Sequence, residues 1–352
     1  MQHNLPKKFR TQCPVCYSNS IQCLWQVTSN QAAQHFVLRE KDKDRHARLA
    51  NHLEHLWNQG ICEVSQCDNC AFCFSNPYIA GDKTFYELAY GRTSYPAWKW
   101  EFQQTYESLA ILFTKKLLKI LEIGAGNGSF IKGIMPELAN KENVLCTEYS
   151  DYGKKEIDRL GIRCFTDNVK NIKLQESLDA IAMFQVLEHM DDLDTLFCKL
   201  NSLLSLGGHL FIAVPNNNRI AFNEKNGALL DMPPNHIGRW NRECFSIIGE
   251  RHGFRLEEHK VEPFHLTSSA RQLVMYRYAR AAQFSGSIQN RAASTQNLWK
   301  RKAFKLIGLA FSSFGSLRAL SRMTDSIGNS QWAHYTKSNP SMYDKQSLKA
   351  EK

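Results

Sequence analysis

The sequence has no long hydrophobic run. Its beginning, MQHNLPKKFRTQCPVC, lacks the apolar core of a secretion signal, and no segment approaches the roughly 20 uncharged apolar residues that cross a bilayer. No internal repeat is present. The sequence therefore predicts a soluble protein rather than an integral membrane protein.

Acidic residues are scarce in the C-terminal quarter. From His265 to the end, 14 Lys and Arg face 3 Asp and Glu, a net charge of +11, whereas the preceding residues hold 30 and 31, a net charge of −1. Within LWKRKAFKLIGLAFSSFGSLRALSR the basic residues alternate with apolar ones. This quarter could attract a membrane surface, an anionic substrate or nucleic acid, or it could form solvated helices with an apolar packing face.

Cysteines are plentiful, and seven of the eleven lie in the first 80 residues. Without a secretion signal, disulfides are not expected, which indicates reduced thiols and a cytoplasmic protein. The pairs Cys13–Cys16 and Cys67–Cys70 have the CxxC spacing of a four-cysteine zinc site. Because four cysteines leave no open position, we predict a structural zinc ion. Three further cysteines are expected to be core or unpaired thiols: Cys23, Cys62 and Cys73.

The order of apolar segments predicts an α/β fold. The 352 residues can bury one large core and carry an accessory domain. From about residue 118, seven apolar runs alternate with amphipathic stretches, as in a doubly wound sheet flanked by helices. The runs are LLKILEI, NVLCTE, IRCFT, LDAIAMFQ, GHLFIAVP, FRLEEHKVE and SQWAHYT. Helical spacing is found in SFIKGIMPELAN, DYGKKEIDRL, DLDTLFCKLNSLL and RECFSIIGERHG.

This order also predicts the domain boundaries. The sixth and seventh strands lie about 65 residues apart, too far for a hairpin loop, so we expect a helical cover over about 265–325. The predicted parts are a zinc-ribbon-like domain at 1–80 with a helical insertion at about 28–60, linking helices at 81–117, a main domain at 118–337 and a tail at 338–352.

The segment KILEIGAGNGSF places a glycine-rich turn after the first strand of the main domain. Dinucleotide-binding folds use GxGxxG, in which the third glycine lets the helix pack on the strand. Here the pattern is GxGxG, formed by Gly124, Gly126 and Gly128, and Ser129 follows. The turn therefore departs from the dinucleotide pattern, although an ordinary glycine-rich turn is the alternative.

Two acids indicate what the turn binds. Glu122 ends the first strand, where a carboxylate would repel a pyrophosphate but suit an ammonium group. Glu148 ends the second strand, 20 residues after Gly128, and could bind two ribose hydroxyls. We expect a ligand with a ribose and an amino-acid end, and without a diphosphate between them.

The segment from Leu118 to about Phe264 resembles the class I S-adenosylmethionine-dependent methyltransferases. Within them it is similar to the branch of the ubiquinone-biosynthesis O-methyltransferases and of many small-molecule and sugar methyltransferases. The motifs are LEIGAGNGSF, CTEYS, LDAIAMFQVLEHM, LLSLGGHLFIAVPNNN and NHIGRWNRECFSIIGERHGF, with IGNSQWAHYTK as the closing strand. The resemblance implies that the cofactor is surrounded by Glu122, Gly124, Gly126 and Gly128 at its methionine part, Glu148 at the ribose, Asp167 and Asn168 near the adenine, and Gln185 at the tip of strand four.

The N-terminal segment resembles the zinc ribbons that precede many bacterial methyltransferases of this branch, including sugar C-methyltransferases. In those proteins too, the second cysteine pair runs into NP and then into an aromatic helix like FYELAYGR. The resemblance supports zinc at the two cysteine pairs.

Methyl transfer to a hydroxyl or carbon acid needs a base near the attacking atom. His189 and His236 are candidates, because both lie at or over the carboxyl edge of the sheet. His189 could instead pack beside the cofactor, and His236 could order its loop. Glu224 is a third base candidate, Asn216 could hydrogen-bond the substrate, and Arg239 could hold a phosphate or carboxylate.

One departure from the family bears on the acceptor. In the ubiquinone O-methyltransferases, the segment matching QVLEH begins with an acid, and its two acids and histidine are associated with a divalent metal. Here Gln185 replaces the first acid and leaves Glu188 and His189. Because an amide is a poorer ligand for a hard cation, this argues against catalytic magnesium and favours a sugar or glycan hydroxyl or carbon over a quinone or phenol.

Two other functions stay open. A zinc-ribbon binding module with a degenerate methyltransferase domain is opposed by the intact GxGxG and both acids. Nucleic-acid methylation is opposed by FQVLEH, which stands where an NPPY-like base-flipping motif would follow strand four.

Acceptor specificity is expected in the 28–60 insertion and the 265–325 cover. If the cover borders the site, Lys300, Arg301 and Lys302 would favour an anionic acceptor such as a nucleotide-linked or lipid-diphosphate-linked sugar. Peripheral membrane contact through 299–322 and dimerisation are the alternatives.

Overall fold

The N-terminal part forms a small sheet of its own. The computed structural model describes residues 9–90, 98–114, 117–174, 177–228 and 231–338, so nearly all of the predicted tail lies outside the described residues. The strands are β1 (Ile21–Thr28), β2 (Ile61–Cys67), β3 (Cys73–Asn76) and β9 (Gly238–Arg239), which pair antiparallel in that order. The last strand comes from far along the chain, so the main domain contributes an edge to this sheet.

Two helices fill the connection between β1 and β2, where a helical insertion was predicted. They are α1 (Ser29–Phe36) and α2 (Lys43–Leu56), followed by the 3-10 turn η1 (Asn58–Gly60). Thr28 begins α1 with a capping box to Gln31, and Asp42 caps α2. Their apolar faces pack against α3 (Lys83–Ala89) in a separate buried cluster.

The main sheet has the seven predicted strands. They are β4 (Ile120–Ile123), β5 (Val144–Thr147), β6 (Arg163–Phe165), β7 (Leu178–Phe184), β8 (Leu204–Pro215), β10 (Phe254–Val261) and β11 (Ser330–Lys337). Their order is β10-β11-β8-β7-β4-β5-β6, with β11 antiparallel to both neighbours and the other pairs parallel. The predicted α/β class and strand set are confirmed.

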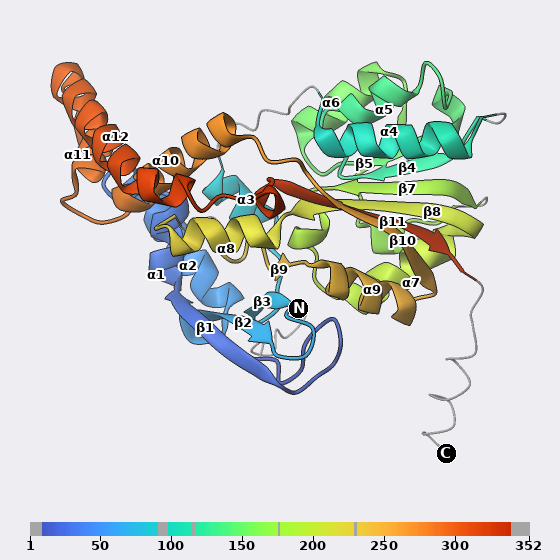
Figure 1. Cartoon of the computed structure of the whole chain (residues 1–352), viewed down its shortest axis with the longest axis horizontal. Coiled ribbons are helices and arrows are strands. Elements are labelled where there is room, and N and C mark those ends of the chain that lie inside the picture. Colours follow the sequence, from blue (N-terminus) through green and yellow to red (C-terminus); the bar gives the residue numbers. More distant parts are fainter. Residues whose placement is uncertain (1–8, 91–97, 115–116, 175–176, 229–230, 339–352) are drawn as a thin grey trace.

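Helices cover both faces of this sheet (Figure 1). One face carries α4 (Trp100–Leu112), α5 (Ser129–Ile134) and α6 (Asp151–Arg159), and the other carries α7 (Leu193–Leu203) and α9 (Arg242–Arg251). After β8 comes α8 (Asn217–Lys225). Shorter 3-10 turns are η2 (Lys141–Asn143), η3 (Val169–Asn171), η4 (Leu187–His189) and η5 (Asp325–Ile327). Alternate residues of β7 face opposite cores, because side chains alternate along a strand.

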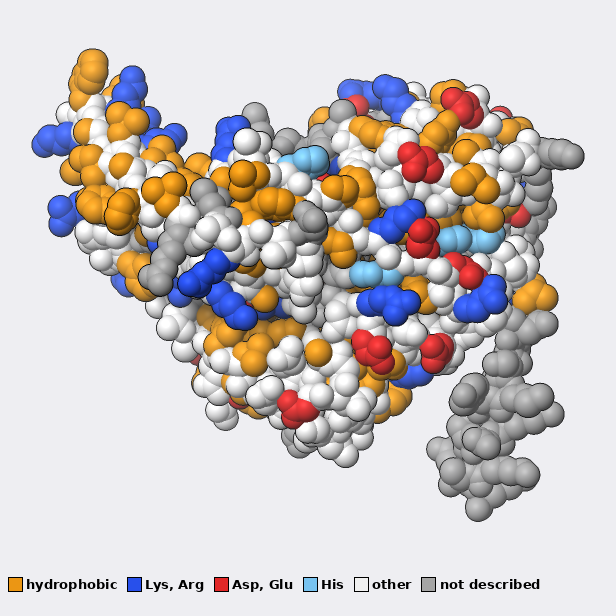
Figure 2. Space-filling model, in the orientation of Figure 1, with side chains coloured by type: hydrophobic (Ala, Val, Ile, Leu, Met, Phe, Trp, Pro, Cys, Tyr) orange, Lys and Arg blue, Asp and Glu red, His pale blue; other side chains and the backbone are white. Residues whose placement is uncertain are grey.

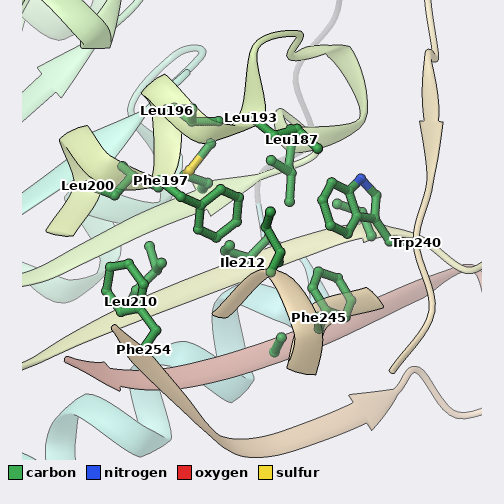
Figure 3. Packing of buried hydrophobic residues seen from close by; sticks show 14 of the residues in the cluster. Leu187, Leu193, Leu196, Phe197, Leu200, Leu210, Ile212, Trp240, Phe245 and Phe254 are labelled. Carbon is green, nitrogen blue, oxygen red and sulfur yellow. The ribbon is translucent and has the colours of Figure 1, made fainter. Parts of the chain in front are cut away.

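The larger core lies between the sheet and the helices α7 and α9 (Figure 3). Phe197 and Phe245 are fully buried there, together with Trp240 from the segment before α9. The same cluster continues into the N-terminal sheet through Phe72 and Phe74. Phe72 meets the ring of Trp240 edge to face, with centroids 4.9 Å apart. The cysteine-bearing segment and the main sheet therefore share one core.

The predicted cover is helical, as expected. It consists of α10 (Leu266–Ala282), α11 (Ile288–Ser294) and α12 (Leu298–Leu320). Strand β10 runs parallel to β8 because both are antiparallel to β11, and Gln331, the partner of Val261, also pairs with Val214, one residue before the end of β8 at Pro215. The cover thus leaves the sheet at the carboxyl edge, where ligands bind in such folds. In the described part of the chain, no helix is long and apolar enough to cross a membrane.

Candidate active site

The glycine turn lies between β4 and α5, at the carboxyl edge of the sheet. Gly124, Gly126 and Gly128 have φ of +70°, +57° and +74°, a region that L side chains rarely adopt. A Cβ on Gly124 would also come within 2.5 Å of the Val186 side chain. The turn therefore needs glycine for its shape and for the close approach of the next loop.

Glu122 lies buried at the base of this turn. Its side chain belongs to a residue that is only 2% exposed, and among the described residues its Oε2 has no hydrogen-bond partner. Burial raises the pKa of Glu122 to about 8. An unpaired buried carboxyl is costly, so a cationic ligand group at this edge would be stabilised by it.

Glu148 joins the turn to the second strand. Its Oε2 accepts a hydrogen bond of 2.8 Å from the Gly126 backbone N–H, and its Oε1 accepts one of the same length from Ser150. Each carboxylate oxygen keeps a further lone pair, so the two oxygens suit two ribose hydroxyls. Asp167 and Asn168 follow β6 at the same edge and are exposed.

Gln185 directly follows β7 and has φ of +58°, and its side-chain amide is held by two other elements. Its Nε2 donates to Glu101 Oε1 at 3.2 Å and to Ser330 Oγ at 3.3 Å. Glu101 comes from α4 and is 3% exposed. The sequence interpretation missed Glu101, and the only available signal was an acid among the aromatic residues of the linking segment.

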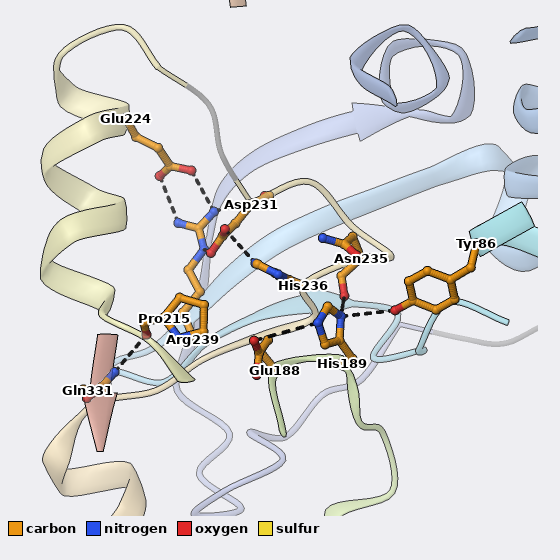
Figure 4. A network of polar contacts seen from close by, with 10 residues as sticks. All are labelled: Tyr86, Glu188, His189, Pro215, Glu224, Asp231, Asn235, His236, Arg239 and Gln331. Atoms are coloured by element: carbon orange, nitrogen blue, oxygen red, sulfur yellow. Dashed lines mark hydrogen bonds and ion pairs between the residues drawn. The ribbon is translucent and has the colours of Figure 1, made fainter. Parts of the chain in front are cut away.

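The side chains of three residues come together near the end of β7 (Figure 4): Glu188, His189 and His236. One ligand atom from each lies within 4.8 Å of the others, and the two imidazole centroids are 4.8 Å apart. Glu188 is 1% exposed, and within the described chain neither carboxylate oxygen has a hydrogen-bond partner. Burial raises the pKa of Glu188 to about 7.

His189 is held in one orientation. Its Nδ1 lies 2.5 Å from the Asn235 carbonyl oxygen, to which it donates, and 3.1 Å from Tyr86 Oη on α3. Burial and, more weakly, the neighbouring His236 lower the pKa of His189 to about 3. A neutral ring with Nδ1 protonated leaves Nε2 unprotonated on the side of Glu188. Tyr86 was missed, although it lies in the aromatic segment FYELAYGR.

His236 pairs with Asp231, a residue that the sequence interpretation also missed. The Nδ1 of His236 lies 2.8 Å from Oδ1 of Asp231, which is 4% exposed. Burial lowers the pKa of His236, but the Asp231 carboxylate and, more weakly, Glu188 outweigh this, so the pKa lies above its usual value. Burial raises the pKa of Asp231, but His236 and Arg239 outweigh that and hold it low. The pair has the geometry of a base with an orienting acid.

Two other predicted site residues, Glu224 and Arg239, form an ion pair with each other next to Asp231. Glu224 Oε2 and Oε1 accept hydrogen bonds from Arg239 Nη1 and Nη2 at 2.9 and 2.7 Å. Arg239 Nε also lies 3.7 Å from Asp231 Oδ2. The predicted roles of Glu224 as base and Arg239 as anion binder stay predictions, and the geometry favours their holding Asp231 in place.

Asn216 caps α8 and holds the loop before β11. Its Oδ1 accepts from the Asn218 N–H, and its Nδ2 donates to the carbonyl oxygens of Ser326 and Gly328 at 2.8 Å each. Both amide protons are therefore used within the protein, and substrate binding by Asn216 stays a prediction.

The four predicted zinc ligands lie together. The Sγ atoms of Cys13 and Cys70 are 3.6 Å apart, those of Cys16 and Cys67 are 3.5 Å apart, and all four lie within 4.8 Å of one another. A tetrahedral zinc ion with Zn–S bonds of about 2.3 Å needs sulfur atoms about 3.8 Å apart, which this set fits. Of the other cysteines in this part, Cys23 is exposed and Cys62 and Cys73 are buried.

Comparison with known proteins assigns the domain. Residues 98–259 match the family model described as a methyltransferase domain. The match assigns this part of the chain to the methyltransferases, and the seven-stranded sheet and the glycine turn agree with a class I S-adenosylmethionine-dependent methyltransferase domain.

Solved structures similar to this chain include further methyltransferases. Coclaurine N-methyltransferase bound to N-methylheliamine and SAH is 14% identical, with a TM-score of 0.42 over 67% of this chain and 72% of that one. An S-adenosylmethionine-dependent methyltransferase from Clostridium acetobutylicum is 7% identical, with a TM-score of 0.41 over 68% and 92%. The N-methyltransferase NodS from Bradyrhizobium japonicum, in complex with S-adenosyl-L-homocysteine, is 12% identical, with a TM-score of 0.37 over 67% and 87%. No curated protein matches the sequence.

Proposed function

We propose that the methyl acceptor is a small molecule or sugar with a hydroxyl or acidic carbon, and that His236 is the general base. The observation that carries this proposal is the hydrogen bond between His236 and the buried Asp231, beside Glu188 and His189. A base of this kind must reach the acceptor proton and have its other ring nitrogen held, and His236 meets the second requirement through Nδ1.

The residues would act as follows. S-adenosylmethionine supplies an electrophilic methyl group on a sulfonium. As the acceptor oxygen or carbon attacks that methyl group, Nε2 of His236 takes the acceptor proton, and the methyl–sulfur bond breaks with its electron pair left on sulfur. Asp231 stabilises the imidazolium that forms, and Arg239 with Glu224 keeps Asp231 oriented. Glu122 and Glu148 would hold the cofactor at the glycine turn.

A pocket of about 430 Å³ supports binding of a polar, anionic acceptor. It is lined by residues of both regions expected to set specificity, and Met232, next to Asp231, also lines it. The polar lining residues from the insertion include Asn30, Gln34, Arg39, Glu40 and His46, and those from the cover include Arg280 and Gln283, so two guanidinium groups face one carboxylate. Amide and guanidinium groups suit sugar hydroxyls and phosphates, which favours a nucleotide-linked or lipid-diphosphate-linked sugar.

We also propose that Cys13, Cys16, Cys67 and Cys70 hold one zinc ion. Its role would be structural, because all four ligands are protein thiolates and no position is open for a substrate. The ion would fix the N-terminal sheet against α9, since Asn241 Nδ2 donates to the Cys70 carbonyl oxygen at 3.0 Å.

A second candidate is a metal-assisted reaction on a quinone or phenol. The convergence of Glu188, His189 and His236 favours it, because a carboxylate and two imidazoles can ligate a divalent ion. Gln185 is bonded to Glu101 and Ser330 and does not replace the acid that the related enzymes have. Under this alternative, chelators would abolish methyl transfer by enzyme whose cysteine-bound zinc is retained.

The test is a His236→Gln variant, assayed against a panel of sugar-nucleotide, lipid-linked sugar and phenol acceptors. We expect kcat to fall by about 10²- to 10⁴-fold while S-adenosylmethionine affinity stays within a factor of about two, because loss of a general base acts on the chemical step. The exposed His55→Gln variant is the matched control. Unchanged turnover in His236→Gln would remove His236 from the mechanism.

A further inference from the structure

Helix α12 packs on the protein through small side chains. Among the residues of α12 whose burial is described, the buried ones are Gly308, Ser312, Ser316 and Ala319, and the helix lies against α10 and α11. A Cβ on Gly308 would come within 2.9 Å of the Tyr278 ring on α10. A helix of a soluble domain normally buries its large apolar residues. In α12 the small residues take that place.

Most of the large apolar side chains described in α12 are exposed instead, whereas Phe304 and Leu309 are half-buried. Trp299 is 82% exposed, Leu306 69%, Phe311 64%, Phe314 80% and Leu317 62%. Of the 21 large apolar side chains exposed in the described part of the chain, seven belong to α12. Positions 299, 303, 306, 310, 314 and 317 follow the three- and four-residue spacing of one helix face, and each is apolar. Figure 2 shows apolar side chains on the projecting part at the upper left, where Figure 1 labels α12.

The charge around this apolar face has one sign. Between Glu262 and Asp325 the sequence has ten Lys and Arg and no Asp or Glu. Lys300, Arg301, Lys302 and Lys305 are exposed in the first two turns of α12. Blue and orange side chains accordingly lie together on this projection in Figure 2.

We propose that α12 is a membrane-binding helix that lays its exposed apolar face into an anionic lipid surface. Interfacial helices combine an apolar face, often with Trp and Phe, with lysine and arginine. The helix lies on the surface rather than across it, because no helix in the described part of the chain is long and apolar enough to span a bilayer.

An anionic lipid surface suits this helix better than a second copy of the chain. Two copies meeting through α12 would bring two strongly basic segments together without an acid to pair them, whereas anionic headgroups complement that charge. The cover leaves the sheet at the carboxyl edge, so the membrane would lie on the same side of the sheet as the proposed acceptor site. If the proposed sugar acceptor is lipid-linked, this placement brings the enzyme to it.

Flotation of the full chain with vesicles tests this proposal. We expect binding to phosphatidylcholine vesicles that contain phosphatidylglycerol, weak binding to pure phosphatidylcholine, and release by salt. The Phe311→Ser/Phe314→Ser variant should lose at least about tenfold in affinity, because both exposed rings would leave the lipid. Removing Lys300, Arg301 and Lys302 together should cost about fivefold for each residue, hence about a hundredfold.

Matched variants separate membrane contact from general surface effects. Ile111→Ser/Leu206→Ser removes two exposed apolar side chains elsewhere, and Lys83→Ala/Lys132→Ala/Lys155→Ala removes three exposed charges elsewhere. Both controls should bind vesicles as the wild type does. Circular dichroism and S-adenosylmethionine calorimetry establish that each variant is folded, so the result does not depend on whether the acceptor assignment is right.

Three results would overturn the proposal. The first is equal binding to anionic and neutral vesicles, and the second is wild-type binding by both α12 variants. In the third, the wild type is a lipid-free oligomer that the Phe311→Ser/Phe314→Ser variant converts to a monomer, with no vesicle binding by either. That outcome would make the apolar face a contact between copies of the chain.

Discussion

His236 and Glu188 are neighbouring groups whose environments raise their pKa values for different reasons. Glu188 is raised by burial without a hydrogen-bond partner in the described chain, whereas the charge of Asp231 overcomes burial at His236. Titratable groups tuned in this way are typical of acid and base residues. The side chain that contributes most to the raised pKa of His236 is therefore that of Asp231.

The Asp231→Asn variant tests this dependence. A neutral amide no longer stabilises the imidazolium, so the pKa of His236 should fall, and the acid limb of kcat/KM, which requires neutral His236, should move to lower pH. The plateau rate should fall by at least about tenfold, because the amide holds the wrong tautomer. The measurement is kcat/KM against pH, with exposed Asp158→Asn as the control. An acid limb at the wild-type pH would show that Asp231 does not tune the base.

Secondary-structure elements that depend on residues close together in the sequence were predictable. Each strand of the main sheet is a short apolar run, and the turn at Gly124, Gly126 and Gly128 needs positive φ at each glycine. Thr28 and Asp42 cap the two helices of the predicted insertion. Such features depend on residues that are close in the sequence.

Side chains brought together by the fold were not predictable. Three residues that the sequence interpretation missed lie in loops and helices whose sequence patterns do not indicate their hydrogen-bond partners: Asp231, Tyr86 and Glu101. Glu224 and Arg239 were both expected at the site, but their pairing depends on how β9 joins β3. One strand pair from distant parts of the chain therefore decides the role of two residues.

The two cysteine-bearing turns allow a direct test of whether zinc stabilises the fold. We expect about one zinc ion per chain in the wild type. A Cys67→Ser/Cys70→Ser variant should contain much less zinc, because two of the four thiolates are removed. Its unfolding temperature should fall by several degrees, since the cysteine turns share the main core with Phe72 and Phe74.

Metal analysis and thermal unfolding measure this effect, with protein prepared without chelator. The exposed pair Cys23→Ser/Cys198→Ser is the matched control, and its zinc content should equal that of the wild type. Absence of zinc from the wild type, or equal zinc in the Cys67→Ser/Cys70→Ser variant, would contradict the zinc assignment.

At the scale of the whole molecule, three regions meet at the carboxyl edge of one sheet. The main domain contributes the glycine turn and His236, the N-terminal part contributes Tyr86 and one wall of the 430 Å³ pocket, and the cover contributes the other wall. Strand β9 ties the loop of His236 to the N-terminal sheet. Under the proposed function, this arrangement would bring the residues for proton transfer, cofactor binding and acceptor binding into one region, although they come from distant parts of the chain.

The most direct test of the account is titration calorimetry of S-adenosylmethionine with the wild type, Glu148→Ala and the exposed control Glu142→Ala. We predict saturable binding to the wild type and the control, and at least about tenfold weaker binding to Glu148→Ala, because two ribose hydroxyls lose their charged acceptor. Gly126→Arg should abolish binding, since its side chain would fill the cofactor's place at the turn. Absence of binding to the wild type, or equal affinity in all four proteins, would contradict the assignment of this site.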